Sequence, residues 1–250
     1  MTRIALIISV VLVACVGPQR ALRSSARTDL GVAYFREGAP EDAVSALEEA
    51  VRLDPRNWRA HNALAVVYVA KGRPELAEAS FRRALGVAPE EAEVLVSFGT
   101  YLVRNGRLDE GLEAYGAALR DLDYRNPAVV HSNLAYALTL ARSPDDAVSH
   151  AREAIRRAPD LCEAHYNLGL ALEARGDPLG AMEAYRRQVE VCPNESIGAR
   201  LRLGCVQFSV GMREEGAAVL DTVAAAAPQS VFAERAHACV QGRTVASELE

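Results

Sequence analysis

Three histidines are, by residue type, the side chains in this chain best suited to metal binding or proton transfer. His61, His131 and His165 each offer imidazole nitrogens, which bind transition metals and titrate near neutral pH. All three fall at the fourth position of a repeating unit described below, and packed helices lie about 8–10 Å apart. Only His131 and His165 belong to consecutive units, so no three-ligand cluster is expected. We predict that these histidines pack between helices, and we predict no metal site.

Four cysteines could form disulfides if the chain reaches an oxidising compartment. Cys162 and Cys192 fall at the start of the first helix and the end of the second helix of one predicted hairpin, and these two points lie at the same end of the hairpin. A disulfide needs Cα atoms within about 7 Å, so a Cys162–Cys192 disulfide and two free thiols both remain compatible with the sequence. Cys205 and Cys239 occupy equivalent positions of successive units, which predicts helix-packing distance and free thiols.

A fifth cysteine, Cys15, ends an apolar segment near the start of the chain. Arg3 precedes an almost wholly apolar run, residues 4–13, that suits the roughly 7–15-residue core of a secretory signal peptide. A transmembrane helix needs about 20 such residues. The sequence LVAC at residues 12–15 resembles a bacterial lipobox. That resemblance implies that residues 1–14 are a signal peptide cleaved before Cys15, which then carries diacylglycerol and an N-acyl (palmitate-type) lipid.

The lipobox also implies a location. Val16 follows the cysteine, in place of the Asp that commonly retains such lipoproteins in the inner membrane, so the resemblance implies the periplasmic face of the outer membrane. Acyl chains contribute about 0.8 kcal/mol per buried CH₂, so more than one chain on Cys15 is a stable anchor. Residues 15–23, with Gly17 and Pro18, are then expected to form a lipid-anchored tether. An ordinary leader with an incidental cysteine is the alternative.

The chain contains none of the common catalytic or nucleotide-binding motifs. HExxH, GxSxG, GxGxxG, P-loop and CxxC patterns do not occur in the sequence. The formal net charge is −5, and loss of Arg3 with the leader makes it −6. Nucleic-acid binding depends on basic surface, so nucleic acid is not expected as a partner. The sequence predicts a non-enzymatic protein with no small-molecule substrate and no cofactor beyond the lipid on Cys15.

A repeat organises most of the chain. Residues 28–57 align with residues 62–91, a period of 34 with small residues at fixed places and a late proline. This pattern resembles the tetratricopeptide repeat, in which each unit is a helical hairpin. We therefore predict an all-α fold, a right-handed tetratricopeptide-repeat superhelix (solenoid) of six hairpins plus a C-terminal capping helix. The repeats occupy residues 24–57, 58–91, 92–125, 128–161, 162–195 and 197–230.

Residue types at fixed repeat positions have physical causes. Positions 8 and 20 are small because the two helices of a hairpin cross there and only small side chains allow close approach. Position 32 is proline in five repeats, which ends the second helix. Position 15 suits the end of the first helix, because glycine adopts the left-handed conformation freely. Position 8 is Gly31, Ala65, Gly99, Ala135, Gly169 and Gly204, and position 15 is glycine at Gly38, Gly72, Gly106, Gly176 and Gly211.

Residues 231–250 follow the last repeat. Val231, Phe232, Ala236 and Val240 are apolar at helical spacing. The last repeat of a solenoid exposes a face that a terminal helix normally covers. We predict that residues 231–241 form this capping helix and that the remaining residues are a frayed end.

The first helices of stacked hairpins are expected to line a concave groove. Exposed apolar strips usually mark partner sites, although the same side chains could instead pack on one another. Lys71 is the only lysine, which disfavours a lysine clamp for a peptide carboxylate and favours a hydrophobic or amphipathic segment as the occupant. The predicted partner groove consists of Val32, Phe35, Asn62, Val66, Val69, Val96, Thr100, Val103, Tyr136 and Leu140.

One stretch, residues 97–138, points to a narrower family. It resembles the PilF/PilW-type pilotins of type IV pili, a group that includes the Tgl gliding-motility lipoprotein. Asn126 and Pro127 lengthen the step from the third to the fourth repeat and fall within this stretch; ordinary loop length is the alternative reading. Val103 stands where family members often have a cysteine. The shared elements are Phe98-Gly99, Leu102, Gly106-Arg107, Tyr124 to Pro127, and Asn133.

This resemblance implies a function and its partners. Pilotins of this type help the secretin, the outer-membrane channel of the pilus, to reach the membrane and multimerise, and they thereby support pilus biogenesis and motility. The implied partners are the type IV pilus secretin and, through the lipid, the outer membrane. An outer-membrane lipoprotein scaffold for β-barrel assembly or for cell-wall enzymes is the alternative. Such a scaffold would share the lipobox and the repeats but would lack the features of residues 97–138.

Overall fold

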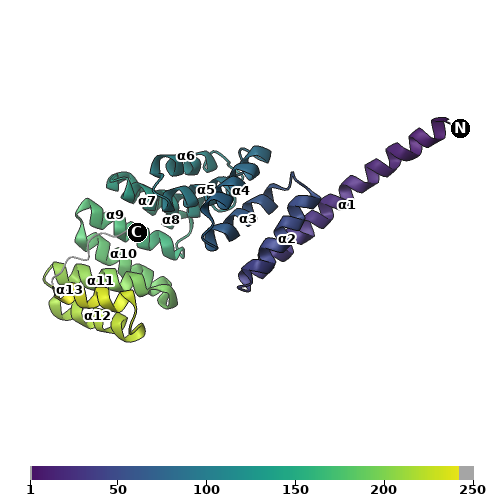
Figure 1. The fold of residues 1–250 in the computed structure, drawn as a ribbon. Coiled ribbons are helices and arrows are strands. Elements are labelled where there is room, and N and C mark those ends of the chain that lie inside the picture. Colours follow the sequence, from purple (N-terminus) through teal and green to yellow (C-terminus); the bar gives the residue numbers. More distant parts are fainter. Residues whose placement is uncertain (1, 242–250) are drawn as a thin grey trace. The chain divides into compact units, whose positions relative to one another are not determined.

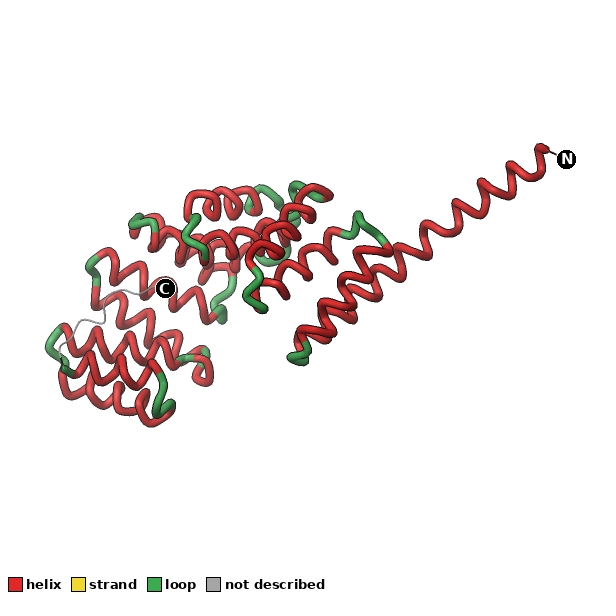
Figure 2. The backbone as a smooth tube through the Cα atoms, in the orientation of Figure 1, coloured by secondary structure: helices red, strands yellow, loops and turns green. Residues whose placement is uncertain are grey.

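The structure, a computed structural model, describes the backbone of residues 2–241 and the side chains of residues 19–241. Every regular element in this range is helical (Figures 1 and 2), which confirms the all-α prediction. A single 3₁₀ turn, η1, precedes α11. The elements are α1 (Thr2–Arg36), α2 (Pro40–Leu53), α3 (Trp58–Ala70), α4 (Pro74–Val87), α5 (Ala92–Arg104), α6 (Leu108–Ala118), α7 (Pro127–Leu140), α8 (Pro144–Arg157), α9 (Cys162–Arg175), α10 (Pro178–Val191), η1 (Pro193–Glu195), α11 (Ile197–Ser209), α12 (Arg213–Ala226) and α13 (Val231–Val240).

The chain forms two compact units that meet after Tyr101, inside α5. Unit 1 holds α1 to α4 and most of α5, and unit 2 holds the end of α5 and α6 to α13. Within each unit, successive helices pack on one another as hairpins, and each hairpin packs on the next, as α2 does on α3 and α8 on α9. This is the nearest-neighbour packing of a solenoid.

Glycine at repeat position 8 allows the two helices of a hairpin to touch. A Cβ added to Gly31 would lie 2.6 Å from Cγ of Leu47 in α2, and one added to Gly169 would lie 2.3 Å from Cε1 of Tyr185 in α10. Both distances are far below van der Waals contact. The predicted crossing of helices at position 8 is therefore confirmed.

Position 15 ends the first helix of each hairpin in the left-handed conformation. The five glycines there have φ between 63° and 91°, and the remaining repeat has Arg142 with φ 59°. A non-glycine residue in this region costs about 1–2 kcal/mol. The same turn hydrogen bond nevertheless forms in the repeat with arginine and in a repeat with glycine. The Ser143 amide donates to the Leu138 carbonyl at 2.9 Å, and the Ala39 amide of the first repeat donates to the Tyr34 carbonyl at 2.9 Å.

A buried polar network fixes the first hairpin to the second. The Ser24 hydroxyl donates to the Ala50 carbonyl at 2.8 Å. The Asn57 amide donates to the hydroxyls of Ser24 and Thr28 at 2.8 and 3.1 Å, while its oxygen accepts the Ala60 backbone amide at 3.0 Å. One side chain therefore caps α3 and ties it to α1 and α2.

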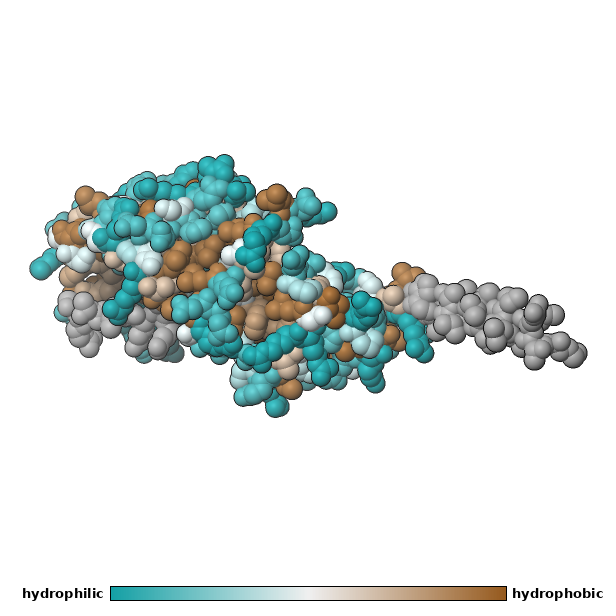
Figure 3. All heavy atoms as spheres, turned by 90° about the horizontal axis from the view of Figure 1, so that it is seen from above, coloured by the Kyte–Doolittle hydropathy of each residue, from teal (hydrophilic) through white to brown (hydrophobic). Residues whose placement is uncertain are grey.

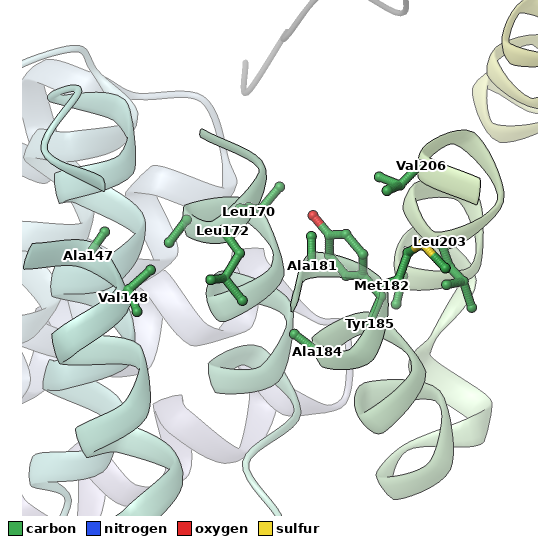
Figure 4. Packing of buried hydrophobic residues seen from close by; sticks show 12 residues of the cluster. Ala147, Val148, Leu170, Leu172, Ala181, Met182, Ala184, Tyr185, Leu203 and Val206 are labelled. Atoms are coloured by element: carbon green, nitrogen blue, oxygen red, sulfur yellow. The ribbon is translucent and has the colours of Figure 1, made fainter. Parts of the chain in front are cut away.

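The core of unit 2 lies where α8, α9, α10 and α11 meet (Figure 4). Tyr185 is fully buried there, and its hydroxyl donates to the Glu173 carboxylate. Burial raises the pKa of both groups above their ordinary values. Ala147, Leu172, Met182 and Leu203 belong to the same cluster.

Helix α13 covers the last hairpin. Ala236 and Cys239 of α13 are buried with Leu201 of α11 and with Leu220 and Val223 of α12. The predicted capping helix is therefore confirmed. No helix in the described part of the chain has an apolar stretch of the length needed to cross a bilayer.

Candidate functional site

A pocket of about 210 Å³ lies within unit 1, between its first helices. Its apolar lining comes mostly from α1 and α3, and its polar lining includes residues of α3 and α5. Hydrophilic side chains cover most of the face seen in Figure 3, with brown apolar residues emerging between them. The lining residues are Thr28, Val32, Phe35, Leu47, Arg59, Asn62, Ala63, Val66, Val67, Glu93 and Ser97.

Asn62 is the chemically distinctive residue of this pocket. Its side chain is only 4% exposed, and its Oδ1 is buried with no hydrogen-bond partner among the described residues. Its Nδ2 lies 3.5 Å from a Glu93 carboxylate oxygen, at the outer limit of a hydrogen bond. A buried polar atom without a partner costs about 1–3 kcal/mol. The unsatisfied oxygen of Asn62 is therefore buried beneath the lining, and the surface that the pocket offers to a ligand is mainly apolar.

Charged residues stand at the edge of the pocket. Arg59 pairs with Asp29 of α1 at 3.5 Å, and both side chains are more than half exposed. Exposed pairs of this kind contribute little to stability, so Arg59 can exchange its partner at low cost. Glu93 stands at repeat position 2, the position of Arg59 one repeat earlier. The repeat register could therefore have identified Glu93 from the sequence, and likewise Thr28, which stands at position 5 as Asn62 does one repeat later, whereas Leu47 and Ser97 follow only from the packing.

The structure distributes the ten predicted groove residues unevenly. Four of them, Val32, Phe35, Asn62 and Val66, line the pocket. Val69 and Thr100 are half-buried in unit 1 outside this lining, and Tyr136 and Leu140 are half-buried in unit 2, where Tyr136 packs against the core.

Two of the predicted groove residues are buried. Val96 and Val103 are 9% and 5% exposed and are not among the residues that line this pocket. They are seven residues apart and share one face of α5. Low exposure alone does not exclude a place in a groove, because Leu47 and Asn62 line the pocket at 0% and 4% exposure. The assignment of Val96 and Val103 to the groove stays a prediction.

Two of the three repeat histidines bind backbone. His61 Nε2 lies 3.0 Å from the Pro55 carbonyl, and His165 Nε2 lies 2.8 Å from the Pro159 carbonyl. Each therefore fastens the start of its own helix to the turn before it, which supports the packing interpretation. No cluster of three or more potential metal ligands occurs among the described residues.

The third histidine has a different partner. His131 Nδ1 lies 2.9 Å from His150 Nδ1 of α8, with the ring centroids 5.2 Å apart. The repeat before His131 has Asp123 where its neighbours have the position-32 proline, and two extra residues follow. The turn before His131 therefore differs in sequence and length from those before His61 and His165, and His131 pairs within its own hairpin.

Acidification is expected to destabilise unit 2 through this pair. Burial lowers the pKa of both imidazoles below the ordinary value of 6.5, and the positive charges of His150 and Arg157 lower the pKa of His131 further. The unfolded chain then binds more protons than the folded chain, so the stability contributed by the neutral pair is complete above about pH 6.5 and is lost as the pH falls through the lower folded pKa values. Asp146 and Glu153 oppose the shift at His150.

Urea unfolding between about pH 7.5 and pH 5.5 tests this expectation. Wild type should lose stability on acidification, and His150→Gln should lose less because the second titrating ring is gone. An unchanged pH dependence in His150→Gln would show that the pair does not carry the effect.

The structure contains two disulfides, both in unit 2. Cys162 and Cys192 are joined with their Cα atoms 6.0 Å apart, one of the two alternatives that the sequence left open. Cys205 and Cys239 are also joined, with Cα atoms 5.4 Å apart. The prediction of free thiols at Cys205 and Cys239 is therefore wrong. Facing Cα atoms of helices packed at the ordinary axial distance of about 8–10 Å can lie within the reach of a disulfide, because each Cα stands about 2.3 Å from its own axis.

The predicted lipid-attachment residue lies outside the described side chains. The backbone of residues 15–23, predicted as a tether, is helical and continuous with the rest of α1. Nothing in the structure bears on the Cys15 side chain, so cleavage before Cys15 and its lipidation stay predictions.

Comparison with known proteins adds relatives in pilus assembly. The chain is 29% identical over 127 residues to type IV pilus assembly protein PilF of Pseudomonas aeruginosa. The aligned segment covers 51% of this chain and 50% of PilF. It is 33% identical over 107 residues to small glutamine-rich tetratricopeptide repeat-containing protein 2 of Mycosarcoma maydis, covering 43% of this chain and 30% of that protein. The chain thus matches half or less of the length of these relatives.

Solved structures show the same fold over most of the chain. The Pseudomonas aeruginosa PilF structure has a TM-score of 0.76 at 23% identity and covers 88% of this chain and 99% of that one. The structure of PilW, a type IV pilus biogenesis factor, has a TM-score of 0.80 at 21% identity. This match covers 84% of this chain and 96% of PilW. A family model for the tetratricopeptide repeat matches residues 28–92, 96–161 and 132–195. The chain belongs to the tetratricopeptide-repeat family.

Proposed function

We propose that this protein takes part in type IV pilus biogenesis as a lipid-anchored pilotin. In this role it promotes the outer-membrane localisation and multimerisation of the pilus secretin. The similarity to PilF and PilW across most of the fold supports a role in pilus biogenesis. The narrower assignment rests on the lipobox-like residues that end at Cys15 and on the pilotin-like features of residues 97–138.

The pocket of unit 1 carries the binding part of this proposal. An apolar side chain of an amphipathic secretin segment would lie against Val32, Phe35 and Val66. The single observation that favours occupancy is this apolar pocket with the exposed Arg59–Asp29 ion pair at its edge.

Charging the pocket tests the proposal. In a strain that lacks this protein, the wild type is expected to restore heat-resistant secretin multimers, whereas Val66→Asp is expected to fail, because it places a carboxylate among apolar side chains. Val66 is 37% exposed, so its replacement should leave the fold intact. Val210→Asp in unit 2, at a valine that is 38% exposed, is the matched control and should restore the multimers.

The same strain tests the anchor. Cys15→Ala is expected to give weak rescue and mislocalised secretin, because the cargo is delivered by the lipid. If secretin multimers are unchanged when the protein is absent, the pilotin assignment fails, and a scaffold for other outer-membrane machinery becomes the function to pursue.

A further inference from the structure

The first hairpin has an uncovered outer face. At the other end of the chain α13 covers the last hairpin, but no described element covers the corresponding side of α1 and α2. Leu22 of α1 is 71% exposed, and Arg23 and Ala26 are exposed beside it. A hollow of about 360 Å³ lies between the two helices on this side, lined by Arg23, Ala26, Arg27, Leu30, Glu49 and Leu53.

The hollow combines an apolar floor with cationic groups. Ala26, Leu30 and Leu53 form its apolar part. Arg27 is paired with Glu49 at 3.1 Å in a half-exposed ion pair, while Arg23 forms no ion pair with any residue that the structure describes. A guanidinium group presents a planar fork of donors that matches phosphate oxygens, so Arg23 beside Arg27 suits a phosphate bound above apolar carbon.

The rest of the helix indicates where such a phosphate would come from. Arg20 lies three residues before Arg23 and seven before Arg27, so the three arginines share one side of α1. Arginines that flank exposed leucine on one helix are typical of segments that lie at a lipid head-group layer.

We propose that this hollow seats the head group of an anionic phospholipid, with Arg23 and Arg27 on the phosphate and the lipid's carbon chain over Ala26, Leu30 and Leu53. The proposal rests on the membrane attachment proposed above. Charge favours lipid over a second copy of this chain as the occupant. A symmetric contact would bring the same patch of both copies together, and residues 19–30 contain three arginines and one aspartate.

Titration of the full chain in non-ionic detergent tests the proposal. Isothermal titration calorimetry would compare dihexanoyl-phosphatidylglycerol with dihexanoyl-phosphatidylcholine. Wild type should bind the anionic lipid more tightly, and Arg23→Gln with Arg27→Gln should weaken that binding about thirtyfold, since each arginine contributes about 1 kcal/mol at an anionic lipid surface. The matched control is Arg82→Gln with Arg83→Gln on α4, where Arg82 is likewise paired with a glutamate. It should bind as wild type does.

Three outcomes would overturn the proposal: equal affinity for the two lipids, equal loss in the α4 control, or a dimer of the purified chain that Arg23→Gln abolishes. Because the titration uses purified protein, its result is independent of the secretin assay. If secretin multimers form normally in a strain without this protein, the pilotin function is wrong and the lipid site is unaffected. If the titration shows no preference for the anionic lipid, only the lipid site is wrong.

Discussion

Replacing both Cys205 and Cys239 with serine is expected to lower the free energy of unfolding by about 3.5–4 kcal/mol. The disulfide closes a segment of 34 residues and joins α11 to α13. Such a cross-link stabilises mainly by restricting the unfolded chain, and the restriction grows slowly with the length of the closed segment. In a solenoid the loss should appear first at the end of the chain, where α13 has only one neighbouring hairpin.

Urea unfolding followed by circular dichroism measures this loss, and amide hydrogen exchange locates it. Faster exchange in α12 and α13, with exchange in unit 1 unchanged, is the expected pattern. The Cys162–Cys192 disulfide closes 30 residues, so its double serine variant should lose a similar amount but should open α9 and α10. A reducing agent should destabilise wild type and leave the quadruple serine variant unaffected. Equal stability of wild type and the Cys205/Cys239 variant would show that this disulfide does not form.

Gly169→Ala is expected to destabilise the protein by about 1–2 kcal/mol. The new Cβ would lie 2.3 Å from Cε1 of Tyr185, a residue with no exposed surface, so the ring must move. Overpacking of this kind costs typically about 1–3 kcal/mol, and movement of the ring also disturbs the hydrogen bond from its hydroxyl to Glu173. Alanine's better helix propensity returns only about 1 kcal/mol. Steric cost therefore exceeds the propensity gain.

Gly116→Ala in α6 of the same unit is the matched control. A Cβ there meets no atom within 4 Å, so only the propensity term remains, and the variant should be about 0.5–1 kcal/mol more stable than wild type. Thermal unfolding of the two variants separates the terms, because their midpoints should move in opposite directions. A stabilised Gly169→Ala would mean that α9 and α10 do not pack as closely as the structure shows.

The sequence by itself determined the repeated hairpin and where its helices end. The backbone needs a small residue where two helices cross, as at Gly31, a glycine at the turn and a proline after the second helix. Each of these needs restricts the residue type at a fixed spacing. The period therefore predicted the helices, their crossings and the capping helix. The family resemblance in residues 97–138 was likewise readable without coordinates, because it consists of residue types at set intervals.

Only the tertiary structure decided which side chains meet. Val96 fits the same repeat rule as the pocket residue Asn62, yet it is not among the residues that line the pocket, and Asn62 holds an unpartnered oxygen. Cys205 and Cys239 lie at a spacing from which we predicted free thiols, and the packing of α13 on α11 joins them. His131 pairs with His150, whereas His61 and His165 bind a backbone carbonyl. Each outcome depends on side-chain direction and on the exact distance between helices, and a residue pattern with a period of 34 contains neither quantity.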